Sequence, residues 1–166
     1  GGSLARYYVS VSYVDEGGMY KVDEGLKDYN TNANYRRWNY RLNVDMDITK
    51  STLLKVGVAG SLDKKNEPGM AGNIWASAMR NNPISVPVMY SNGYVPAYGS
   101  ENDQLNPWVA ATQTGYQETW NNKLQANATL EQSLNFITKG LKFIGRYGFD
   151  TNNYQWINRK KFPEMW

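Results

Sequence analysis

The sequence predicts an all-β chain, with about five antiparallel strands connected up and down as a segment of a transmembrane β-barrel. Three observations lead to this expectation. Apolar and polar side chains alternate in five segments, long and short connections alternate along the chain, and aromatic residues gather at the ends of the apolar faces. The 166 residues include 13 Tyr and 6 Trp but only 4 Phe. Amphipathic rings of this kind suit a boundary between dry and wet surroundings.

The clearest predicted strand covers residues 37–49, where strict alternation places successive side chains on opposite faces. Its apolar face carries Trp38, Tyr40, Leu42, Val44, Met46 and Ile48, and its polar face carries Asn39, Arg41, Asn43, Asp45 and Asp47. The same pattern predicts strands near residues 6–15, 53–63, 119–132 and 141–150. Apart from Asp15 at the end of the first segment, no charged residue falls on the apolar face of any of the five segments.

The connections between these segments alternate in length. Residues 16–36 and 64–118 are long connections, whereas residues 50–52 and 135–140 are short. All six prolines are expected outside the strands, because proline cannot donate a hydrogen bond to a neighbouring strand. Within the longest connection, residues 72–81 predict a short helix that ends before Pro83.

Alternation also suits a soluble antiparallel β-sandwich, which has one apolar and one polar face. That alternative stays open, as a module that binds carbohydrate through surface aromatics. The barrel is favoured because the segments approach the roughly 9–11 residues that cross a bilayer. In an up-and-down sheet the aromatic ends also fall at the edge with the long connections, as an interfacial girdle requires. The girdle consists of Tyr13, Trp38, Tyr40, Trp120, Tyr147 and Phe149.

Several classes of function are not expected. The chain has no Cys and no His, which removes disulfides, thiol nucleophiles, the common catalytic triads and most transition-metal sites. We therefore expect no enzyme, no cofactor and no metal. The net charge is only +3, and the charged residues are dispersed along the chain. We therefore expect no basic patch of the kind that binds nucleic acid. Five strands are too few to close a barrel, which needs about eight, so we expect the chain to be an interior part of a larger protein.

An ordered series of segments resembles the SusC/RagA family of TonB-linked outer-membrane transporters. It begins with residues 6–13 after Gly1-Gly2-Ser3 and continues with residues 35–45. The later segments are Leu54-Lys55-Val56-Gly57, residues 87–93, Asn106-Pro107 and residues 136–142. The resemblance spans essentially the whole chain.

The resemblance implies a barrel of about 22 strands closed by a plug, and it implies that the plug lies outside this chain. It further implies a nutrient importer for glycans or peptides in the bacterial outer membrane. A SusD-like surface lipoprotein would act as its lid, and TonB would supply energy through the N-terminal part. The chain itself would then contribute barrel wall, lumen lining and two long extracellular loops.

Two sets of residues are expected to carry function. The lumen lining is predicted to include Arg41, Asn43, Asp45, Asp47, Lys123, Gln125 and Arg146, as solvated or ion-paired side chains. Contacts with substrate or lid are predicted for Trp75, Tyr90, Asn92, Tyr94, Tyr98 and Trp108, because aromatic faces and amides can receive sugars or peptides. The alternative for the second set is packing of the loop against itself or against the lid.

Overall fold

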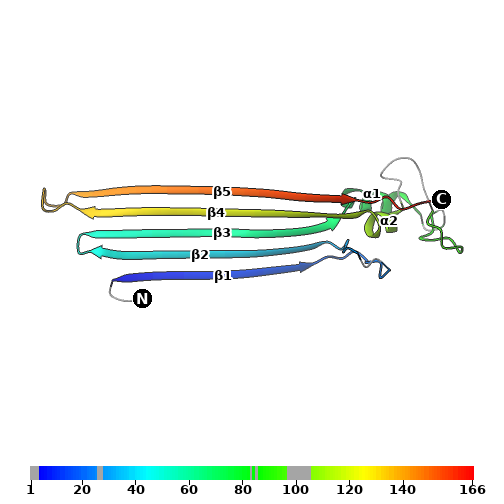
Figure 1. Ribbon diagram of the computed structural model, residues 1–166, viewed down its shortest axis with the longest axis horizontal. Coiled ribbons are helices and arrows are strands. Elements are labelled where there is room, and N and C mark those ends of the chain that lie inside the picture. The colour runs from blue at the N-terminus through cyan, green and yellow to red at the C-terminus, as the bar shows by residue number, and fades with distance from the viewer. Residues whose placement is uncertain (1–3, 26–27, 83, 85, 97–105) are drawn as a thin grey trace. The chain divides into compact units, whose positions relative to one another are not determined.

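The computed structural model describes residues 4–25, 28–82, 84, 86–96 and 106–166. The protein is all-β, with a five-stranded antiparallel sheet whose strands follow one another up and down in chain order (Figure 1). The strands are β1 (Ala5–Gly17), β2 (Asn34–Thr49), β3 (Thr52–Pro68), β4 (Gly115–Ser133) and β5 (Lys142–Lys160). β1 and β5 form the two edges of this sheet. The predicted all-β class and the antiparallel meander are therefore confirmed.

Each predicted segment coincides with a strand, but several strands are longer than predicted. β5 continues to Lys160, whereas the prediction ended it at residue 150. The prediction stopped there because Thr151 and Asn153 make the apolar face polar, although backbone pairing continues. The expectation that all prolines lie outside strands is wrong for Pro68, the last residue of β3. A strand end tolerates proline because pairing stops beside it.

The two short connections are closed by local hydrogen bonds. Between β2 and β3, the Thr49 hydroxyl donates to Thr52 Oγ1 at 2.7 Å. Between β4 and β5, the Gly140 amide donates to the Asn135 side-chain oxygen at 2.8 Å, and Gly140 has a φ of 87°. A positive φ is readily adopted only by glycine, so Gly140 suits this turn.

The chain divides into two compact units, which are described separately. The first unit consists of the described residues within 1–14, 37–63 and 121–154, and the second of those within 15–36, 64–120 and 155–166. The described residues of the first unit include only two buried ones, Gly57 and Ser61. The sheet residues of this unit therefore have no buried apolar core.

The buried apolar core lies in the second unit. It consists of Met70, Ile74, Val95, Val109 and Ala110. These residues come from the connection between β3 and β4 and from its helices α1 (Ala71–Arg80) and α2 (Pro107–Thr112). α1 confirms the helix predicted at residues 72–81, whereas α2 was not predicted. Neither helix in the described part of the chain has the length and apolar character needed to span a membrane.

Candidate functional site

In the first unit, polar residues of all five strands share one face of the sheet. Asn39 of β2 donates to the Ser12 hydroxyl of β1 at 3.0 Å. A hollow is lined together by Arg41 of β2, Ser61 of β3 and Lys123 of β4, and by Asp150 of β5. We call this side the polar face. Because side chains alternate along a strand, the apolar residues share the opposite side, the apolar face.

The apolar face is uncovered in the described part of the first unit. Val11 is 72% exposed, Phe143 54% and Tyr147 69%. Other exposed members of this face are Tyr7, Val9, Tyr13, Leu42, Ile48, Leu130 and Phe149. At the end of the face, the rings of Tyr13 and Trp38 lie 5.1 Å apart between centroids. Most of these side chains would be expected inside a protein that folds in water.

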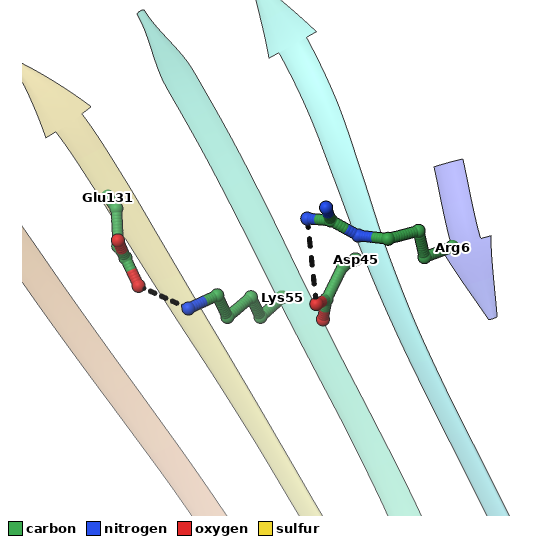
Figure 2. A network of polar contacts seen from close by, with 4 residues as sticks. All are labelled: Arg6, Asp45, Lys55 and Glu131. Atoms are coloured by element: carbon green, nitrogen blue, oxygen red, sulfur yellow. Dashed lines mark hydrogen bonds and ion pairs between the residues drawn. The ribbon is translucent and has the colours of Figure 1, made fainter. Parts of the chain in front are cut away.

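Ion pairs cross the polar face from strand to strand. Arg6 pairs with Asp45 between β1 and β2, with 4.0 Å between nitrogen and oxygen, and Lys55 pairs with Glu131 between β3 and β4. Figure 2 shows the two pairs beside one another. All four side chains are partly exposed to solvent, so each pair contributes little to the stability of the fold. The two ion pairs show that this face of the sheet accommodates charged side chains.

The hollow between Arg41 and Lys123 on the polar face has a volume of about 520 Å³. The central strand β3 contributes only small residues to it, Ala59, Gly60 and Ser61. The longer side chains Arg37, Asn39 and Arg41 of β2 and Lys123 and Gln125 of β4 border the same space. Because β3 lies between β2 and β4, its small residues leave room that the neighbouring side chains surround.

The charges of the hollow differ in how they are compensated. Arg37 Nε lies 3.4 Å from the Asp63 carboxylate and donates to the Asn39 side-chain oxygen at 2.8 Å. Arg41 and Lys123 make no ion pair with any described residue, nor does Asp150. The hollow therefore presents two uncompensated cations and one uncompensated carboxylate.

The residues predicted for the lumen lining lie at different places on the sheet. Arg41, Lys123 and Gln125 line the hollow. Asp45 pairs with Arg6, and Asp47 lines a smaller hollow of about 160 Å³ that Lys142 also borders. Asn43 and Arg146 are exposed and border neither hollow.

Other residues that line the hollow were not singled out from the sequence as lumen lining, namely Arg37, Asn39, Ser61 and Asn152. The register of alternation assigns Asn39, Ser61 and Asp150 to the polar face, so that signal was present in the sequence. Their proximity to Arg41 and Lys123 follows from strand pairing, which the register of a single strand does not give.

Of the six residues predicted for substrate or lid contact, the five that the structure describes do not form one site. Trp108 packs against the core of the second unit, and the Tyr94 ring lies 5.1 Å from that of Trp166. Asn92 accepts a hydrogen bond from the Tyr94 amide in a turn that also includes Tyr90. Trp75 is 61% exposed on α1, and Tyr98 lies outside the described residues. Trp108 and Tyr94 thus pack within the second unit, and Trp75 is the most exposed of the described aromatics in this set.

The second unit carries a charged band in the register of the apolar face. Glu118 is two residues from Trp120 on β4, and its carboxylate lies 3.2 Å from Lys64 Nζ. Arg36 Nε lies 3.5 Å from the Asp15 carboxylate. Along their strands, Arg36 and Asp15 are two residues from Trp38 and Tyr13. The aromatic ends on β1, β2 and β4 are therefore each followed by a charged residue in the same register.

A second polar hollow, of about 410 Å³, lies beside this band in the second unit. Its lining includes four amide side chains, those of Asn30, Asn32, Asn34 and Asn66. The Tyr29 and Tyr116 rings also border it, 5.9 Å apart between centroids. Burial raises the pKa of Tyr29, so its phenol stays neutral at ordinary pH. The lining contains both cations and carboxylates, and the Lys64 and Glu118 charges compensate each other.

No protein-family model matches the chain, and no curated protein matches its sequence. The resemblance to SusC/RagA transporters therefore stays a prediction that rests on the quoted segments.

Proposed function

We propose that this chain is part of the barrel wall of a TonB-linked outer-membrane importer of the SusC/RagA type. In this proposal the apolar face contacts lipid hydrocarbon, and the polar face borders an aqueous passage. The uncovered apolar face carries the proposal, because Val11, Phe143 and Tyr147 are more than half exposed in a sheet with no buried apolar core.

The free energy of such exposure supports a lipid environment. Transfer of each large apolar side chain out of water is favourable by about 1.5–3 kcal/mol of free energy. Water-soluble monomers rarely expose a contiguous apolar patch larger than about 300–600 Å². A β-sandwich would cover this face with a second sheet, whereas the described residues form a single sheet. Hydrocarbon covers the face without a second layer of protein.

The end of the apolar face supports a membrane boundary. Tyr13 and Trp38 are followed, two residues along their strands, by the ion-paired Asp15 and Arg36. Aromatic rings are enriched where a membrane meets water, and charge becomes favourable just beyond that level. The long connections then follow the charged band, as extracellular loops follow the girdle of an outer-membrane barrel.

The proposal requires further strands beside β1 and β5. In lipid, an open sheet edge leaves backbone donors and acceptors without partners, at a cost of several kcal/mol each. Closure of the sheet by additional strands removes this cost. The plug, TonB acting through it and a SusD-like lipoprotein over the long connections belong to the same proposal, with glycans or peptides as imported nutrients.

Membrane fractionation tests the proposal. The gene product that contains these residues would be expressed in a Gram-negative host, and its outer membranes would be separated and washed with carbonate. We expect the protein in the washed outer membrane, with release only by detergent. A monomer that stays in solution without detergent would instead support the carbohydrate-binding β-sandwich.

A further inference from the structure

We propose that the hollow lined by Arg41, Lys123 and Asp150 binds the carboxylate of a ligand, so that acidic sugars or peptides are taken in preference to neutral counterparts. This inference names the class of ligand for the proposed importer. It rests on the proposed function only in that the polar face must border water.

The charge of the hollow favours an anion. Its lining includes three cations, Arg37, Arg41 and Lys123, against one carboxylate, Asp150. Arg37 is already held by Asp63 and Asn39. Arg41 and Lys123 have no ion-pair partner among the described residues, so they can receive a ligand without first breaking a bond within the protein.

The arrangement of strands suits one group held between two cations. Arg41 lies on β2 and Lys123 on β4, on either side of β3. Neighbouring strands lie about 4.8 Å apart, so the two backbones are roughly 10 Å apart. Both side chains are long enough to approach an anion placed above Ala59. The guanidinium can bind a carboxylate through two parallel hydrogen bonds, and the ammonium adds a point charge.

The rest of the lining suits the neutral part of such a ligand. Gln125 and Asn152 each offer amide donors and an acceptor that can bind sugar hydroxyls or peptide groups. The volume of about 520 Å³ falls within the roughly 300–1,000 Å³ of small-molecule sites. Asp150 repels an anion, so its carboxylate limits the affinity for one.

Calorimetric titration of the detergent-purified gene product tests the inference with paired ligands. D-glucuronate would be compared with D-glucose, and the dipeptide Ala-Ala with its C-terminal amide. We expect one or both of the acids to bind at least about tenfold more tightly than its neutral counterpart, as a charge-assisted hydrogen bond implies. The pair of ligands with the larger difference in affinity shows whether the preferred carboxylate belongs to a sugar acid or to a peptide.

Substitutions then locate the binding. Arg41→Gln and Lys123→Gln are each expected to lower the affinity for the acidic ligand by about tenfold or more. The affinity for the neutral counterpart should stay unchanged. Asp150→Asn is expected to raise the affinity for the acidic ligand. Lys139→Gln removes the same charge from the exposed connection between β4 and β5 and should have less than about a twofold effect.

Equal affinity for both members of each pair would overturn the inference, as would equal effects of Lys123→Gln and Lys139→Gln. An absence of binding by all four ligands would also overturn it. A membrane-integrated protein without discrimination refutes the inference alone. A detergent-free soluble protein that discriminates refutes the proposed function alone.

Discussion

The ammonium of Lys64 lies 4.5 Å from the centre of the Trp120 ring, while its nitrogen also pairs with Glu118 at 3.2 Å. The three side chains lie in one register of β3 and β4, with the aromatic ring followed by the two charges. In the proposed barrel this is the level at which hydrocarbon ends and water begins. The ring would face the headgroups, and the charges would lie in water.

Trp120→Ala is expected to lower the free energy of unfolding in lipid vesicles by about 1–3 kcal/mol. It removes a cation–π contact worth about 0.5–2 kcal/mol and an interfacial aromatic ring. Equilibrium urea unfolding would measure the change. Trp75→Ala, which removes an exposed Trp from α1, is the control and should change stability by less than about 0.5 kcal/mol. Equal effects of the two substitutions would contradict a special role for Trp120.

Gly60→Ala is expected to destabilise the sheet by about 1–3 kcal/mol, as overpacking does. A methyl group at this position would overlap the Lys123 backbone carbonyl and the Tyr40 ring. The matched control is Gly72→Ala in α1, where an added methyl group meets nothing within 4 Å. That control should stabilise the protein by about 0.5–1 kcal/mol, because alanine favours a helix. A neutral Gly60→Ala would show that β3 and β4 pack less closely than described.

Substitution of Asn106 is expected to loosen the core of the second unit. Its side-chain oxygen accepts from the Trp108 amide at 3.0 Å, and its amide donates to the Val88 carbonyl at 3.2 Å. Asn106→Ala removes the helix cap and the donor, at about 1–3 kcal/mol. Asn106→Asp keeps the cap but brings a buried carboxylate close to carbonyls.

Hydrogen exchange of the α2 amides would measure both variants. We expect faster exchange in each of them, with strand amides of the first unit unchanged. If Asn106→Asp retained the protection of the native protein, the bond from Asn106 to Val88 would contribute nothing.

The sequence predicted the strands well where one face is apolar and the other polar. At residues 37–49 the alternation of Trp38, Tyr40 and Leu42 with polar neighbours identified most of β2. The pattern could not identify the strand ends, because Thr151 and Asn153 are polar in the register of the apolar face while β5 continues. Alternation identifies only the part of a strand that has an apolar face, whereas backbone hydrogen bonding sets the full length of the strand.

The site was predicted only in part, because it depends on pairing between strands. Alternation placed Arg41 and Lys123 on the same type of face but gave no distance between them. The small residues Ala59 and Ser61 make the hollow, and they show no chemical signal of their own. Trp108 was predicted as a contact residue from its type, and its place against the core follows from α2, which the sequence analysis missed.

The most direct test of the central claim compares two adjacent residues of β5, Arg146 on the polar face and Tyr147 on the apolar face. The 166 residues contain no cysteine, so Arg146→Cys and Tyr147→Cys can each carry one fluorophore, with any cysteine of the adjoining sequence removed. Quenching would be measured in vesicles with brominated lipid chains and, separately, with iodide in water. We expect lipid to quench the label at position 147 and iodide to quench the label at position 146. Iodide quenching at both positions, with no effect of brominated lipid, would contradict the account.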